Sequence, residues 1–135
     1  MTTSAEGGCR CGAVRYRANG AMVVGTLCHC RSCRLASGAP SVGWACFATN
    51  DFAFISGEPV AYASSPGVER TFCGRCGTPL TYRKLAEGRT VDVTTTTLDN
   101  PDAFAPTKEI WVGEKLGWEC TNPTMRQFAQ SSAGS

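Results

Sequence analysis

GGCRCGAV at residues 7–14 and FCGRCGTPL at residues 72–80 place two pairs of cysteines far apart in a chain of 135 residues. In an extended segment, side chains two residues apart point to the same side, so the first pair can hold one ion. A Cys-x-x-Cys turn does the same on a tight loop. The glycine after each pair can adopt the positive φ that directs backbone N–H groups toward the thiolates. We therefore predict a closed tetrahedral zinc site with four thiolate ligands, Cys9, Cys11, Cys73 and Cys76.

The second pair allows two other interpretations. A redox-active Cys-x-x-Cys pair should open a helix, yet Cys76 is followed by Gly77, Thr78 and Pro79 and then by the strand-like LTYR. An iron–sulfur ligand set has similar spacing, because thiolate sites accept iron as well as zinc. The spacing disfavours the redox pair but does not separate zinc from iron.

A third cysteine group lies in LCHCRSCR at residues 27–34, together with the single histidine of the chain. Cys28, Cys30 and Cys33 offer three thiolates and have no fourth cysteine once the other pairs are joined. His29 stands between two of them and should project to the opposite side if this stretch is extended. Three protein ligands and one open position are typical of catalytic zinc, so we predict a second zinc whose fourth ligand is water or substrate.

Two further cysteines leave an alternative open. Cys46 or Cys120 could complete the group of three, which would make the second site closed and structural. Cys46 alternates with Val42 and Trp44, a pattern that fits a small buried apolar residue. Cys120 has no ligand neighbour in the sequence, so we interpret it as incidental.

Size and composition predict one cytosolic domain that is large enough to bury a core. The N-terminal MTTSAEGG has neither a basic start nor an apolar run, and no stretch approaches the roughly 18 apolar residues of a membrane span. In a reducing cytosol, cysteine-rich chains bind metals more often than they form disulfides. We expect a cytoplasmic protein with a single zinc-binding domain over residues 1–135, a core at about 7–120 and a disordered tail at 131–135.

The net charge argues against a nucleic-acid partner. It is only +2, and the chain has no block or tail rich in lysine and arginine. A zinc ribbon that binds nucleic acid is therefore the least favoured function.

Fifteen glycines and seven prolines divide the chain into short segments, which favours β-structure with short helices. A short helix is expected over residues 31–37, with Gly38 as its left-handed cap. Asparagine before proline at 100–101 and at 122–123 predicts two further short helices. The pattern of β-branched, aromatic and alternating residues predicts strands in a mainly antiparallel β fold, at residues 13–18, 42–48, 90–98 and 108–113.

Taken together, GGCRCGAVRY, LCHCRSCRLASGA and FCGRCGTPL resemble the glutathione-dependent formaldehyde-activating enzyme family, whose relatives include the centromere protein V type. The three motifs match in order, and a looser resemblance continues through VDVTTTTLDNPDAFAPTKEIWV, so that it covers about residues 7 to 112. The resemblance implies an Mss4-like β fold that is stabilised by zinc at the four-cysteine site. It also implies a second zinc at Cys28, Cys30 and Cys33, where glutathione reacts with an aldehyde.

The leading functional hypothesis is a zinc-dependent carbon–sulfur lyase similar to S-(hydroxymethyl)glutathione synthase, with a role in formaldehyde detoxification. It would use two zinc ions per chain and form or break adducts between glutathione, the co-substrate, and formaldehyde or another small electrophile. The alternative is a non-catalytic, zinc-stabilised β module that binds a protein partner. A module that only binds a protein partner would not require a metal site with three protein ligands and an open position.

Two groups of side chains are candidates for substrate contacts. Arg31 and Arg34 flank Cys33 and could bind the carboxylates of glutathione in a bidentate manner, although solvated arginines on a helix face would have the same pattern. Three tryptophans could line a pocket or fill the core, and we favour the core for Trp44, Trp111 and Trp118.

Overall fold

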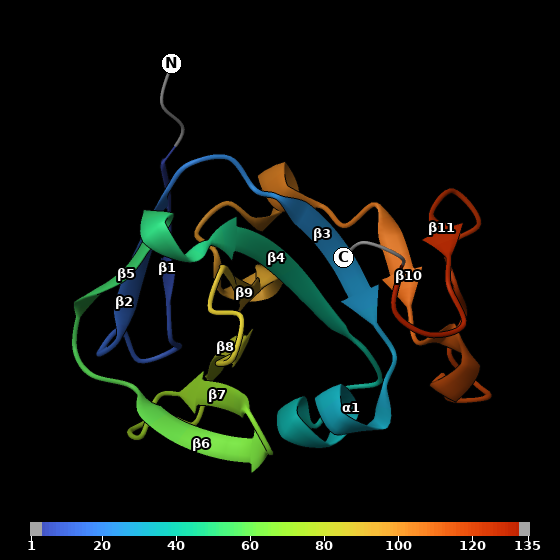
Figure 1. Ribbon diagram of the computed structural model, residues 1–135, viewed down its shortest axis with the longest axis horizontal. Coiled ribbons are helices and arrows are strands. Elements are labelled where there is room, and N and C mark those ends of the chain that lie inside the picture. Colours follow the sequence, from blue (N-terminus) through green and yellow to red (C-terminus); the bar gives the residue numbers. More distant parts are fainter. Residues whose placement is uncertain (1–3, 133–135) are drawn as a thin grey trace.

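The computed structural model describes residues 4–132, and its strands form two sheets (Figure 1). The smaller sheet is antiparallel and has the order β1-β2-β5. Tyr16 and Ala18 of β2 are buried while the arginines beside them are half-buried, which confirms the alternation seen in the sequence. The strands of this sheet are β1 (Ser4–Gly8), β2 (Arg15–Asn19) and β5 (Phe52–Ser56).

The larger sheet contains eight strands in the order β11-β10-β3-β4-β9-β8-β7-β6. Its strand pairs are antiparallel except at β10, which runs parallel to both of its neighbours, β3 and β11. The prediction of a mainly antiparallel β fold is thus confirmed. The strands are β3 (Val24–Cys28), β4 (Val42–Ala48), β6 (Val60–Ser65), β7 (Val68–Phe72), β8 (Pro79–Lys84), β9 (Thr90–Thr94), β10 (Lys108–Ile110) and β11 (Arg126–Gln127).

The α-helix α1 (Arg31–Ser37) follows β3 and occupies the residues predicted for it. Its N-cap is Cys30, whose Sγ accepts a hydrogen bond from the Cys33 backbone N–H at 3.3 Å. Its C-cap is Gly38 at φ 66°, whose N–H donates to the Arg34 carbonyl. The helix follows the end of β3 after a short turn in Figure 1, and Cys33 of the helix lies close to Cys28 at the end of the strand.

Two other strands end at earlier residues than the sequence predicted. The strand predicted at 90–98 stops at Thr94 and continues as a 3-10 turn, and the strand predicted at 108–113 stops at Ile110 because Trp111 adopts the left-handed conformation at φ 56°. Asn100 precedes a 3-10 helix without capping it by its side chain. The 3-10 helices are η1 (Thr49–Asp51), η2 (Thr95–Thr97), η3 (Pro101–Phe104) and η4 (Val112–Glu114).

The prediction of a second helix capped by asparagine, at residues 122–123, is wrong. Asn122 forms a turn in which its side-chain oxygen accepts from the backbone N–H and the hydroxyl of Thr124, at 2.9 and 2.7 Å. These local hydrogen bonds satisfy the capping oxygen without a following helix.

The main core joins side chains of both sheets. Tyr16 and Phe47 are fully buried, and they pack with Leu80 and Val93 of the larger sheet. The Tyr16 hydroxyl is 2.7 Å from the Thr97 hydroxyl, so its polar end is satisfied inside the core. Cys9 and Cys73 belong to the same core, at the cluster described below.

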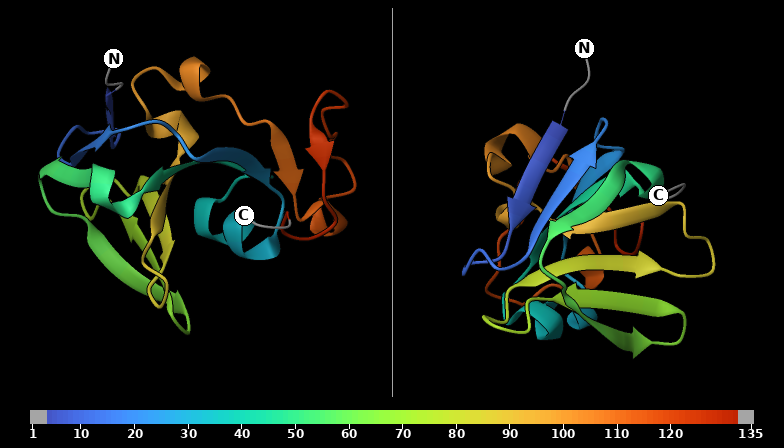
Figure 2. Two further views of the ribbon diagram at one scale, coloured as in Figure 1. Left: turned by 45° about the horizontal axis from the view of Figure 1, so that its top comes forward. Right: turned by 90° about the vertical axis from the view of Figure 1, so that its left-hand side faces the viewer.

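The C-terminal segment returns along β10. Backbone N–H groups of Trp111 and Val112 donate to the carbonyls of Gln130 and Phe128, and Lys108 Nζ donates to the buried Ser132 hydroxyl at 3.3 Å. Of the tail expected at 131–135, residues 133–135 lie outside the described residues. Figure 2 shows this segment and the smaller sheet at opposite ends of the molecule. Within residues 4–132, no helix has the length and apolar character that a bilayer crossing requires.

We predict that Phe47→Ala lowers the free energy of unfolding by about 3–5 kcal/mol, because it empties a fully buried site in the core. Tyr62→Ala is the control, since this side chain is 61% exposed and its removal should change stability by no more than about 0.5 kcal/mol. Urea unfolding followed by circular dichroism measures both. Similar losses in the two variants would contradict the assignment of the core.

Candidate metal centres and the adjoining cavity

The four cysteines of the predicted closed site lie together. The Sγ atoms of Cys9, Cys11, Cys73 and Cys76 are all within 4.8 Å of one another. Two separations, Cys9–Cys11 and Cys11–Cys73, are 3.6 and 3.8 Å. A tetrahedral zinc site with Zn–S bonds of about 2.3 Å has sulfur–sulfur edges of about 3.8 Å, so this donor set fits zinc.

The backbone around these thiols also has the expected form. Gly12 and Gly77, which follow the two pairs, adopt φ angles of 79° and 83°. The Val14 N–H donates to Cys9 Sγ at 3.3 Å, and two N–H groups of the second turn donate to Cys73 Sγ at 3.4 Å. Such N–H donors stabilise thiolates, as metal ligands require.

The three thiols of the second group lie where β3 ends and α1 begins. The Sγ atoms of Cys28, Cys30 and Cys33 are within 4.8 Å of one another. Cys28 and Cys33 are buried and Cys30 is half-buried. Among residues 4–132, neither Cys46 nor Cys120 joins a metal-binding group, so the structure does not bring a fourth cysteine to these three.

His29 points away from the three thiols, as its position between two of them predicts. It is fully buried, and its Nε2 lies 2.6 Å from Glu109 Oε1 in β10. The other oxygen of Glu109 accepts from the Asn122 backbone N–H and from Gln127 Nε2, at 2.5 and 2.8 Å. This network anchors the β3–α1 loop, and with it the two flanking cysteines, to the C-terminal segment.

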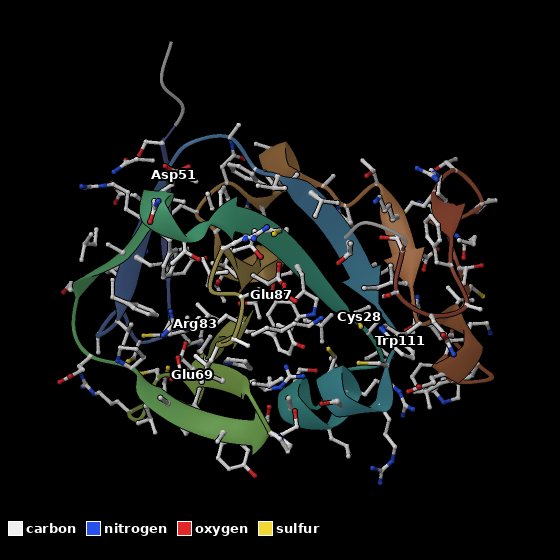
Figure 3. The ribbon with its side chains drawn as sticks, viewed as in Figure 1. Cys28, Asp51, Glu69, Arg83, Glu87 and Trp111 are labelled. Atoms are coloured by element: carbon white, nitrogen blue, oxygen red, sulfur yellow. The ribbon has the colours of Figure 1, made fainter. Side chains whose placement is uncertain are left out.

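A cavity of about 460 Å³ opens beside the three thiols, within the range of small-molecule sites. Its aromatic walls are Trp44, Tyr82 and Trp111, and the β8–β9 hairpin with Glu87 contributes to its rim. Figure 3 shows Cys28 and Trp111 close together where β3 ends, with Glu87 on the hairpin. The thiols therefore face a space that could admit a substrate.

Arg70 of β7 is a site residue that the sequence analysis missed. Its side chain lines the cavity, and its Nη2 lies 3.1 Å from Ser32 Oγ and 3.7 Å from Cys33 Sγ. Hydrogen bonds from Cys28 and Cys30 hold the pKa of Cys33 far below its usual range, and the Arg70 guanidinium contributes in the same direction. The only signal in the sequence was its place three residues before Cys73, which says nothing about a contact with a distant cysteine.

The two arginines expected to contact glutathione lie outside the cavity beside the three thiols. Arg34 donates from Nε to the His29 carbonyl and from Nη2 to the Glu114 carbonyl, both at 3.3 Å. Arg31 is exposed and lines a second cavity, of about 680 Å³, between α1 and strands of the larger sheet. Neither lines the cavity beside the three thiols.

The tryptophans divide between the cavity and the surface. Trp44 is buried and Trp111 half-buried, and both line the cavity. Trp118 is 72% exposed, so the prediction that it fills the core is wrong. The sequence around it has no alternation that could have shown its exposure.

Cys46 and Asp92 are partners in register on β4 and β9, and both line the cavity. Burial raises the pKa of Asp92 to about 6, and the hydrogen bond from Cys46 acts in the opposite direction. Burial also raises the pKa of Cys46 to about 12, so Cys46 remains a thiol. The cavity thus holds a carboxyl group that exchanges its proton close to neutral pH.

Comparisons with known proteins show which family and fold this chain resembles. The model of the family described as glutathione-dependent formaldehyde-activating enzyme matches residues 4–114. An uncharacterized lyase of Schizosaccharomyces pombe is 36% identical over 78 residues, which are 57% of this chain and 56% of that protein. The chain thus matches about half the length of this curated relative.

A crystal structure of a Rhodobacter sphaeroides protein has a similar fold. The TM-score is 0.61 at 18% sequence identity, and the match covers 91% of this chain and 98% of the other. At this identity the similarity concerns the fold alone.

We predict that the Asp92 carboxyl titrates with a midpoint near pH 6, above the usual value of about 3.9, because burial disfavours its charged form. Cys46→Ala should raise the midpoint further, since it removes a hydrogen bond that favours the carboxylate. Carbon-13 NMR of labelled aspartate between about pH 5 and pH 8 measures both.

Asp99 is the internal control for this titration. Its pKa lies below the usual range because the Arg15 guanidinium donates to it, so its resonance should not move across the same pH range. An Asp92 midpoint near that of an ordinary carboxyl group would show that water solvates this wall of the cavity.

Proposed function

This chain belongs to the glutathione-dependent formaldehyde-activating enzyme family, and we propose that it is a zinc-dependent carbon–sulfur lyase. Its substrates would be glutathione, or a similar thiol, and formaldehyde or another small electrophile. The observation that carries the proposal is the group of three thiols that face a cavity and find no fourth histidine, cysteine or carboxylate ligand among residues 4–132. The naming of a relative as a lyase supports the reaction class.

The donor sets support two different roles for zinc. Cys9, Cys11, Cys73 and Cys76 would hold a structural ion in a closed site, and the other three thiols would hold a catalytic ion. A catalytic zinc would supply an open position at which a thiol, with a free pKa of about 8.5, binds as the thiolate.

The side chains around this position would orient the reactants. Trp44 and Trp111 line the cavity together with the thiols and would give a substrate an apolar surface to pack on. The sulfur of the co-substrate attacks the aldehyde carbon, so that a carbon–sulfur bond forms while the carbonyl π bond breaks and its oxygen takes up a proton. Asp92 is a carboxyl group of this cavity whose pKa of about 6 suits the donation and recovery of that proton near neutral pH.

We predict that the two cysteine groups respond differently to serine substitution. Cys73→Ser should lose one zinc and unfold at a much lower temperature, because binding free energy at a closed structural site is folding free energy. Cys30→Ser should also lose one zinc but should melt within a few degrees of the native protein. Zinc per chain and thermal melts measure this, with exposed Cys120→Ser as control. Equal losses of stability would contradict the division of roles.

The catalytic proposal is tested by exchange between free and adducted glutathione. Thiols and formaldehyde combine without a catalyst, so the rate must be compared with its background by NMR. Native protein with two zinc ions should raise the exchange rate about tenfold or more, because a bound and oriented thiolate reacts faster. Cys30→Ser should return the rate to background, whereas Cys120→Ser should leave it at the native value.

A background rate for native protein that holds both zinc ions would contradict the formaldehyde reaction. The non-catalytic β module would then be the better explanation if the protein also fails to bind glutathione. Glutathione binding without exchange would point instead to another electrophile.

A further inference from the structure

Arg70 is a buried cation that has no carboxylate partner. The residue is 8% exposed, and none of the ion pairs formed among residues 4–132 includes it. Its Nε is buried and has no hydrogen-bond partner. A buried charge is costly unless an opposite charge compensates it, so the environment of Arg70 has to supply negative charge.

The neighbours of the guanidinium identify the source of that charge. Its carbon lies 4.9 and 5.9 Å from the ring centres of Tyr82 and Trp44, which attract a cation but carry no net charge. Its Nη2 reaches Ser32 Oγ and Cys33 Sγ in the first turn of α1. Cys33 of the second metal group, ionised as a metal ligand, is therefore the anionic group that contacts Arg70.

The net charge of the second thiol group with its metal ion explains why a guanidinium lies beside it. Three thiolates and one divalent cation carry a net charge of −1, which one guanidinium neutralises. A fourth thiolate would then leave the assembly at −1 instead of the −2 of an isolated four-thiolate zinc site. Because opposite charges attract strongly where water is excluded, Arg70 favours an anionic ligand at the open position over a neutral one.

The closed four-cysteine site shows why the second group needs this cation. Cys11 and Cys76 are exposed, so water can screen the negative charge of the first site. In the second group Cys28 and Cys33 are buried, and solvent cannot do the same. There the positive charge of Arg70 compensates the negative charge that water cannot screen.

We propose that Arg70 determines the ligand specificity of the three-thiolate site, by acting as its charge partner and selecting an anionic sulfur over a neutral nitrogen or oxygen ligand. The inference rests on the proposed function, since it takes Cys28, Cys30 and Cys33 to hold a metal ion.

The test compares the affinities of two ligands, glutathione and imidazole, for the full-length protein loaded with cobalt(II). A thiolate bound to cobalt gives a charge-transfer absorption that imidazole does not give, so titration reports which ligand occupies the open position. Arg70→Met removes the charge and keeps an apolar stem, and Arg70→Lys keeps the charge. Arg17→Met is the matched control, because Arg17 pairs with Glu6 on the smaller sheet and does not line the cavity.

Arg70→Met should weaken glutathione binding about tenfold or more and leave imidazole binding within about twofold. Arg70→Lys should retain most of the preference for glutathione, and Arg17→Met should match the native protein. Equal affinity of native protein and Arg70→Met for glutathione overturns the inference. If Arg70→Met does not hold cobalt at the second site, the result for Arg70→Lys decides. The inference is supported if Arg70→Lys keeps the native ratio of glutathione affinity to imidazole affinity, and it is overturned if that ratio is lost.

Failure of the proposed function has a different signature. If native protein with two cobalt ions shows no charge-transfer change on addition of glutathione, the thiol does not bind at this metal, and the proposed function fails with the inference. If native protein shows the change and Arg70→Met shows it at the same concentration, only the role of Arg70 is wrong.

Discussion

The meeting of four thiols from two hairpins is the constraint on which the rest of the structure depends. Cys9 and Cys11 lie between β1 and β2 of the smaller sheet, while Cys73 and Cys76 lie between β7 and β8 of the larger one. The core continues from this point, since Cys9 and Cys73 pack within the main apolar cluster. A metal ion here would join two sheets that share no strand, and only two short turns would carry its ligands.

The second thiol group depends on that frame but is built differently. It uses a strand end and a helix start in place of two turns, and His29 ties the connecting loop to Glu109 in β10. The first group is closed and partly exposed to solvent, whereas the second is buried, incomplete and open to a cavity. The difference in burial and in the number of thiols is the basis for proposing two chemical roles for the same ligand type.

Local spacing explains how much could be predicted from the sequence. The two thiol groups, the helix over 31–37 and its glycine cap depend on neighbours within a few residues, and these predictions agree with the structure. Arg70, the carboxyl group of Asp92 and the hydrogen bonds of Arg34 depend on contacts between distant segments, which no periodicity encodes. The parallel pairing of β10 was missed for the same reason, because three residues carry too little pattern to fix a direction.

The contact between His29 and Glu109 has a consequence for the order in which the protein is assembled. The two residues are 80 positions apart, so the second thiol group leaves the ribosome long before its support does. All four thiols of the first group have been synthesised by residue 76, so they can come together while the C-terminal segment is still being made. During synthesis, the three thiols of the second group thus emerge before the first group is complete, yet they are the last to be fixed in place.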